Sequence, residues 1–236
     1  MKRYDFVLLD ADMTLLDFER SEREALRRVL AAAGIEPTEQ VCADYSKIND
    51  ALWQAFARGE LDQDFLTVER FAALLRLYGP GNQSPAALSR AYEHALGEEA
   101  HLLPGALDFC RELKRRGYHL AIATNGLPVP QRGRWTRTGL DQVIPDIFIS
   151  MELGVQKPLP AYFDRVCAAL GITDRSRAVM VGDSLTSDIR GGHDAGLDTI
   201  WFNQKGLPLT GPAAPTYTAS GYDDVLAILT GRSDIM

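Results

Sequence analysis

Cysteine is scarce in this chain of 236 residues, with only three occurrences, Cys42, Cys110 and Cys167. The three are scattered and form no C-x-x-C pair, which argues against a disulfide framework and against a sulfur-ligated metal site. We therefore expect three free thiols in a protein of a reducing compartment.

Long hydrophobic runs and an excess of positive charge are also lacking. No run approaches the length of a membrane span, and the apolar stretch near the N-terminus stops at Asp10, too short for a secretory signal. Asp and Glu number 32 against 25 Lys and Arg, so the formal net charge is −7. General binders of nucleic-acid polymers or anionic membranes are more often basic. We expect a soluble cytoplasmic protein with a small-molecule partner, and both a monomer and a homodimer remain open.

Helical periodicity dominates the first part of the chain after one short strand. Residues 4–9 form a brief apolar run bounded by acids, which predicts a buried strand. From about residue 20 to residue 100 the apolar residues recur at helical spacing, and four helices are predicted without a strand between them. Ser21 and Glu24 have the spacing of a capping box, which predicts that the first helix begins there. Four helices with short loops are typical of a small bundle.

The pattern changes after Pro104-Gly105. Short strands rich in Val, Ile and Ala now alternate with helices, which predicts a parallel sheet covered by helices on both faces. The first strand has no other sheet nearby in the sequence. We expect it to join this sheet, with the helical segment as an insertion.

Polar residues collect where the predicted strands end, which is where open α/β sheets bind their ligands. The first strand ends in Asp10 and Asp12, the second in Thr124-Asn125-Gly126, and the fourth in Asp183. Lys157 follows the third strand, and Asp188 lies one helical turn beyond Asp183. These residues would converge on one edge of the sheet.

This set of residue types suits phosphoryl chemistry. Clustered carboxylates repel one another unless a hard cation or a lysine holds them together, and Mg²⁺ binds through carboxylates and phosphate oxygens. One carboxylate can attack a phosphoryl group while a second acid handles the leaving group's proton. A threonine hydroxyl and backbone N–H groups suit phosphate oxygens, and a lysine offsets their charge.

The segments DADMT, ATNG, QKP and GDSLTSD, in this order after successive strands, resemble the four motifs of the haloacid dehalogenase superfamily. The resemblance covers the whole chain. It implies an α/β fold with a Rossmann-like parallel-sheet core, formed by residues 1–16 and 102–236. It also implies an all-helical cap of the four-helix-bundle type, residues 17–101, inserted after the first motif.

The resemblance also implies roles for single residues. Asp10 resembles the family nucleophile and Asp12 its general acid and base, while Lys157 would orient Asp10 and balance the phosphate charge. Thr124, Asn125 and Gly126 would bind the phosphate group of a phosphomonoester. Many members have glycine after the second acid, where this chain has Met13.

Mg²⁺ is the cofactor that the resemblance implies. Asp183 would bind it together with the Asp10 carboxylate and the main-chain carbonyl of Asp12. Asp188 would support the metal's surroundings, although an acid at this position can also simply favour a helix N-terminus.

The presence of Asp12 argues against the name-giving dehalogenases, which lack that second acid. The stretches DADMTLLDF and INDALWQAFARGEL resemble the pyrimidine 5′-nucleotidases, cytoplasmic enzymes that dephosphorylate pyrimidine nucleoside monophosphates. Phosphoglycolate and sugar-phosphate phosphatases are the nearest alternatives. A phosphoglucomutase and a catalytically idle binding protein also stay open. Trp53 lies at helical spacing with Tyr45 and Phe56, which favours the core of the insertion over contact with a base.

Overall fold

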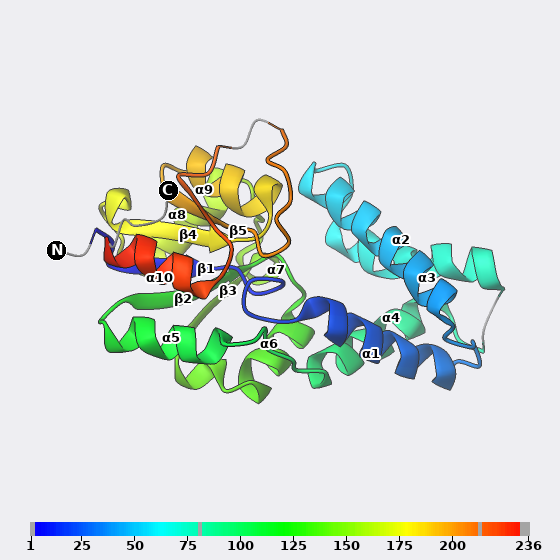
Figure 1. The fold of residues 1–236 in the computed structure, drawn as a ribbon. Helices are drawn as coiled ribbons and strands as arrows, with labels where there is room; N and C mark the ends of the chain where they lie inside the picture. Colours follow the sequence, from blue (N-terminus) through cyan, green and yellow to red (C-terminus); the bar gives the residue numbers. More distant parts are fainter. Residues whose placement is uncertain (1–2, 80–81, 212–213, 232–236) are drawn as a thin grey trace. The chain divides into compact units, whose positions relative to one another are not determined.

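The computed structural model describes residues 3–79, 82–211 and 214–231 (Figure 1). The chain divides into two compact units. The core unit comprises residues 1–17, 101–128 and 135–236, and the helical unit comprises residues 18–100 and 129–134. Among the described residues, no helix is long and apolar enough to cross a membrane.

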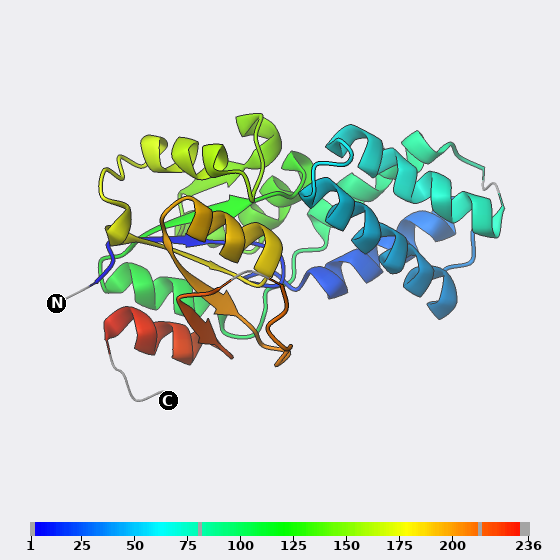
Figure 2. The same ribbon diagram turned by 90° about the horizontal axis from the view of Figure 1, so that it is seen from above.

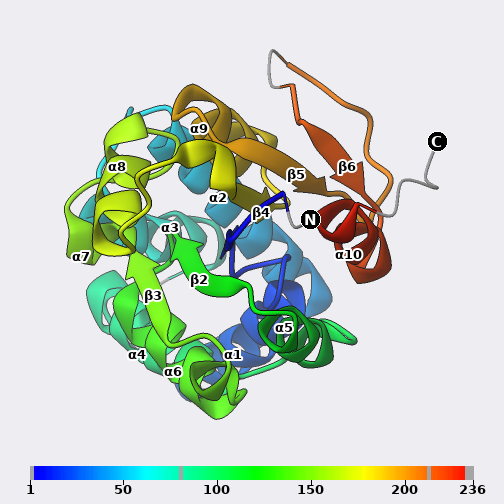
Figure 3. The same cartoon turned by 90° about the vertical axis from the view of Figure 1, so that its left-hand side faces the viewer.

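The core unit is built on a parallel sheet of six strands within its described residues (Figure 3). Its strands are β1 (Phe6–Leu9), β2 (His119–Thr124), β3 (Asp146–Ile149), β4 (Ala178–Gly182), β5 (Asp198–Phe202) and β6 (Tyr217–Ala219). The spatial order is β3-β2-β1-β4-β5-β6, and every neighbouring pair is parallel. The strand arrows accordingly run the same way in Figure 2. The expectation that the first strand joins the later ones is confirmed, since β1 lies between β2 and β4.

Helices cover both faces of this sheet, as expected. Val7 and Leu9 of β1 point into one apolar cluster, with residues of α5 and α10, whereas Leu8 points into another, with residues of α8. Successive side chains of a strand alternate between faces, so both sides of β1 are buried. The helices of the core unit and of its junction are α5 (Ala106–Arg115), α6 (Pro128–Arg137), α7 (Ser150–Leu153), α8 (Pro160–Ala169), α9 (Arg190–Asp194) and α10 (Tyr222–Thr230).

The helical unit contains the four expected long helices, α1 (Phe18–Ala32), α2 (Glu39–Ala57), α3 (Gln63–Tyr78) and α4 (Pro85–Glu98). Thr38, Asp62 and Ser84 cap α2, α3 and α4 by accepting a backbone N–H three residues on. The capping box at Ser21 and Glu24 was wrong, because α1 already begins at Phe18 and Ser21 is buried inside it. Because Ser21 lies one turn inside the helix, its side chain is not placed to cap the helix N-terminus.

Part of α6 belongs with the helical unit. Its residues 129–134 group with α1 to α4, although the helix follows directly on the Thr124-Asn125-Gly126 turn of the core. A methyl group on Gly133 would lie 2.6 Å from the carbonyl oxygen of Gly97 on α4. No real side chain tolerates that distance, so this close approach requires glycine.

A network of buried polar groups joins the four helices of the helical unit. The Glu22 carboxylate on α1 accepts hydrogen bonds from Ser46 Oγ (2.7 Å) and Asn49 Nδ2 (3.0 Å) on α2. Asn49 Oδ1 in turn accepts from the buried guanidinium of Arg70 on α3 (3.4 Å), which faces Glu93 of α4 at 4.0 Å. Burial, reinforced by the nearby charge of Asp50, raises the pKa of Glu22 to about 7.

Replacing Glu22 by glutamine should flatten the pH dependence of stability. The unfolded carboxyl has a pKa of 4.5, so between pH 4.5 and about 7 the folded state holds a proton that the unfolded state has released. The stabilisation is therefore complete below pH 4.5 and is lost as the pH rises through 7, by on the order of 3 kcal/mol. Melting temperatures of the wild type and of Glu22→Gln, measured from pH 5 to 8, test this.

The control for this experiment is Glu98→Gln, which removes a carboxylate that is 53% exposed on α4. It should follow the wild type at every pH. Other buried acids contribute to both curves, so the difference between wild type and Glu22→Gln isolates Glu22. Parallel curves for these two proteins would contradict the prediction.

Candidate active site

The strand ends bring together residues that are far apart in the chain. The sheet order reverses between β1 and β4, and ligands of doubly wound sheets bind outside such a point. Asp10 follows β1 and its backbone N–H donates to the carbonyl of Val181 on β4 (2.9 Å). Asp183 follows β4 directly. The predicted acids therefore lie at the carboxyl edge of two adjacent central strands.

Lys157 holds two of these acids together. Its buried ammonium donates to Asp10 Oδ1 (2.7 Å), Asp188 Oδ1 (2.6 Å) and the carbonyl oxygen of Ala123 (2.7 Å). An ammonium has three donors, so all of them are satisfied. Such charge-assisted bonds are short and strong, and a buried ion pair is tolerated only when its groups are fully bonded.

The Thr124-Asn125-Gly126 turn is hydrogen-bonded to the backbone of Lys157 through the side chain of Asn125. Asn125 Nδ2 donates to the carbonyl of Lys157 (2.9 Å), and the Lys157 N–H donates back to Asn125 Oδ1 (3.0 Å). Thr124 Oγ1 accepts from the Gly126 N–H (3.0 Å) and is buried. This pairing fixes the position of the turn after β2 relative to Lys157.

Asp188 completes an acid cluster with Asp10 and Asp183. One carboxylate oxygen of each lies within 4.8 Å of the others. Asp188 is fully buried, and its Oδ2 accepts from the Ser184 N–H (3.1 Å). A methyl group on Gly182 would lie 2.3 Å from the Asp188 carboxylate, so only glycine leaves room for it.

The pKa values of the cluster reflect crowded negative charge. Burial, together with Asp188 and Asp183, raises the pKa of Asp10 well above its usual range. Burial and Asp188 raise the pKa of Asp183 to about 7. Burial alone would lower the pKa of Lys157, but Asp10 and Asp188 outweigh it and the pKa is raised. Lys157 thus stays charged, but its single positive charge does not balance the negative charge of three buried acids.

The donor set fits a hard divalent cation. Three carboxylates face a single ammonium, and carboxylate oxygens are the ligands that Mg²⁺ prefers. Each carboxylate oxygen carries two lone pairs, so the oxygens of Asp10 and Asp188 that already accept one hydrogen bond can still bind a metal ion.

Asp12 lies beside this cluster without joining it through its side chain. The carboxylate is half-buried and is close enough to raise the pKa of Asp183. The main-chain carbonyl of Asp12, and not its carboxylate, is the expected metal ligand. The next residue, Met13, has φ 58°, and its N–H donates to the carbonyl of Leu16 (2.9 Å). This left-handed conformation explains why glycine is common at the position.

Sequence reasoning missed Trp201 on β5. Its indole Nε1 donates to the main-chain carbonyl of Asp183 (2.9 Å). The sequence pattern of a buried strand predicts that its tryptophan belongs to the hydrophobic core. The parallel register places Trp201 opposite Gly182 and so brings its indole to the turn after β4.

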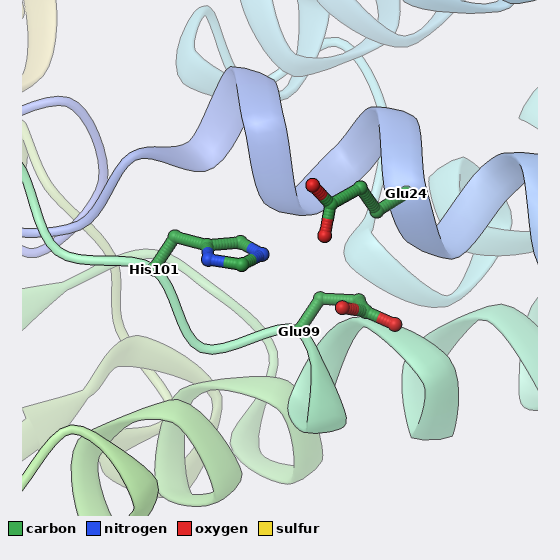
Figure 4. A group of neighbouring side chains, drawn as sticks. All are labelled: Glu24, Glu99 and His101. Carbon is green, nitrogen blue, oxygen red and sulfur yellow. The ribbon is translucent and has the colours of Figure 1, made fainter.

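A second group of candidate ligands, Glu24, Glu99 and His101, is drawn in Figure 4. Glu24 belongs to α1, Glu99 follows α4, and His101 opens the returning segment of the core unit. Glu24 is paired with Arg20 (2.9 Å) and Glu99 with Arg28 (3.4 Å). Because these acids already have cationic partners, we assign no metal to them.

The aromatic residues at helical spacing lie largely inside the helical unit. Tyr45 and Phe56 are buried, as the core interpretation expects. Trp53 is only half-buried and meets Phe56 edge to face, with ring centroids 5.6 Å apart.

The fold and this arrangement of acids and lysine are typical of one family of phosphatase-type hydrolases. The haloacid dehalogenase-like hydrolase family matches residues 4–196, so the chain belongs to it. The chain is 38% identical to the HAD-hydrolase YfnB of Bacillus subtilis, with 97% of each chain covered. A crystal structure of YfnB, described as bound to magnesium and as revealing interdomain movement, has a TM-score of 0.90 at 37% identity, covering 97% of this chain and 99% of that one.

Two further relatives are named as pyrimidine 5′-nucleotidases. PynA of Streptococcus pneumoniae is 34% identical, over 96% of this chain and 95% of its own. YjjG of Escherichia coli is 33% identical, over 96% of this chain and 98% of its own.

Proposed function

We propose that this protein is a Mg²⁺-dependent phosphomonoester hydrolase that works through an aspartyl-phosphate, with pyrimidine nucleoside 5′-monophosphates as its substrates. The observation that carries the chemistry is the bond network of Lys157, which holds the Asp10 carboxylate at the carboxyl edge of the sheet. The substrate class is supported by the near-complete match to PynA and YjjG.

Asp10 is the proposed nucleophile. Lys157 holds Asp10 Oδ1, and the other carboxylate oxygen attacks phosphorus as the bond to the leaving oxygen breaks. Asp12, two residues on in the same turn, gives its proton to that leaving oxygen. The products of this step are the nucleoside and a phosphoryl group bound to Asp10.

The second step is hydrolysis. Asp12, now ionised, takes a proton from water, which attacks the phosphoryl group and releases inorganic phosphate with regeneration of the Asp10 carboxylate. The Thr124 hydroxyl proton and the backbone N–H of Asn125 are proposed to bind phosphate oxygens. Gly126 completes this turn, because its N–H donates to Thr124 Oγ1 and orients that hydroxyl. The Lys157 ammonium offsets the charge that develops on the phosphate oxygens.

Asp10, Asp183 and the Asp12 main-chain carbonyl are the proposed Mg²⁺ ligands, with Asp188 in support. When bound, the ion offsets negative charge on the phosphate group and on the acid cluster. The raised pKa values of Asp10 and Asp183 support a cation here, because a positive charge would return both acids to their ionised forms at neutral pH.

The inserted segment 17–101 is proposed to act as a cap that selects the leaving group. The description of YfnB as showing interdomain movement supports two units that move relative to each other. Trp53 is half-buried on α2, so part of its ring is available to a planar ligand.

Phosphate release from a substrate panel should show preference for UMP, dUMP and dTMP over purine monophosphates, phosphoglycolate and sugar phosphates. Turnover should require Mg²⁺ and vanish in EDTA. We expect specificity constants at least about tenfold higher for the pyrimidine nucleotides, the discrimination that one or two good pocket contacts provide.

The alternatives predict different outcomes for the same panel. Strong turnover of phosphoglycolate or sugar phosphates with poor nucleotide turnover would keep the mechanism and reject the substrate class. Interconversion of hexose phosphates without net phosphate release would indicate a mutase. A folded protein that is silent towards every phosphate ester would indicate a binding protein.

A further inference from the structure

The peptide unit between Asp183 and Ser184 is held at both of its polar atoms. The carbonyl of Asp183 accepts from Trp201 Nε1 (2.9 Å), and the N–H of Ser184 donates to Asp188 Oδ2 (3.1 Å). A planar peptide with both groups bonded has a fixed orientation. That orientation restricts the backbone at Asp183 and thereby the direction of its side chain.

The two anchors differ in kind. Asp188 is itself a member of the acid cluster, so it can reorganise when charge in the cluster changes. Trp201 is neutral, buried and carried by β5, whose backbone is paired with β4 in register, Trp201 opposite Gly182. Its indole is therefore the rigid anchor of the turn that presents the Asp183 carboxylate.

We propose that Trp201 is a positioning residue for metal binding, which acts by fixing the Asp183 carbonyl and so pre-orienting the carboxylate. This inference rests on the proposed Mg²⁺ site. Groups that orient a metal ligand commonly contribute 10–100-fold to affinity. The proximity of the indole N–H to the site also makes Trp201 an intrinsic reporter of metal binding.

The experiment measures the Mg²⁺ dissociation constant by calorimetry without substrate. Trp201→Phe keeps the apolar bulk but removes the donor, and we expect at least about tenfold weaker binding. Trp135→Phe is the matched control, because Trp135 Nε1 also donates to a main-chain carbonyl, that of Ile144 (3.0 Å), which is not in the acid cluster. Its Mg²⁺ affinity should equal that of the wild type.

Wild-type protein labelled with 5-fluorotryptophan gives a second measurement that needs no site variant. The three tryptophans give three ¹⁹F resonances, and Trp53→Phe and Trp135→Phe assign two of them. The Trp201 resonance should shift on Mg²⁺ addition with the midpoint found by calorimetry.

The outcomes separate the two proposals. If the wild type does not bind Mg²⁺, the proposed metal site fails and the positioning role falls with it. If the wild type binds Mg²⁺ but Trp201→Phe binds equally well, or the Trp201 resonance does not move, only the positioning role is overturned. If Trp201→Phe does not fold, the ¹⁹F titration of the wild type decides.

Discussion

Asp10→Asn should abolish phosphate release while the protein stays folded. Asparagine has nearly the same shape as aspartate and can still accept the bond from Lys157, but its neutral amide is too weak a nucleophile to attack phosphorus. Removing a nucleophile costs on the order of 10⁴-fold or more in kcat. The measurement is single-turnover and steady-state phosphate release at saturating substrate and Mg²⁺.

Circular dichroism and the melting temperature establish that Asp10→Asn is folded. An asparagine can revert to aspartate by slow deamidation, so Asp10→Ala should be assayed beside it and should be equally inactive. Asp108→Asn, at a side chain that is 85% exposed on α5, is the matched control with wild-type turnover expected. Near-normal turnover in both Asp10 variants would refute the proposed mechanism.

Lys157→Met should lose both activity and stability. The buried carboxylates of Asp10 and Asp188 would lose the cation that contacts each of them, at 2.7 and 2.6 Å. Removing one partner of a buried ion pair typically costs about 3–5 kcal/mol. Urea unfolding in EDTA measures this loss, and turnover should fall because Asp10 is no longer held.

Added Mg²⁺ should restore part of the lost stability, since it supplies positive charge to the same acids and binds only the folded state. Lys157→Met combined with Asp188→Asn should also be more stable than Lys157→Met alone, because one unpaired charge is gone. Lys47→Met, at a side chain that is 76% exposed, is the control. Unchanged stability in Lys157→Met would show that the ion pairs contribute nothing net.

The central part of the site could be predicted because strand ends converge in a parallel sheet. Asp10 and Asp183 directly follow β1 and β4, and Asp188 lies in the helical turn Leu185–Ile189 after β4, so the alternation of strands and helices places them near one edge. Lys157 stands between α7 and α8, and its place in the site was expected because its segment resembles a family motif. The structure brings these side chains within bonding or ligand distance. Their roles in catalysis stay a prediction until the variants are measured.

Other features depend on packing that the sequence does not reveal. Trp201 reaches Asp183 only through the register of β5 against β4. β6 has three residues, too few to show alternation, and it forms because it pairs with β5. Glu22 looks like an exposed helix residue in the sequence, yet partners from another helix, Ser46 and Asn49, allow its burial.

The central position of β1 has a consequence for how the protein is made. β1 is synthesised before the whole helical insertion, whereas its two neighbours in the sheet, β2 and β4, are synthesised after it. Contacts so distant in sequence form slowly, and an unpaired apolar strand is prone to aggregate until both edges are covered. The helical segment can fold before β1 pairs with its neighbouring strands. The residue proposed to attack phosphorus is thus synthesised well before the strands on either side of it, and its surroundings form only when those strands pair with β1.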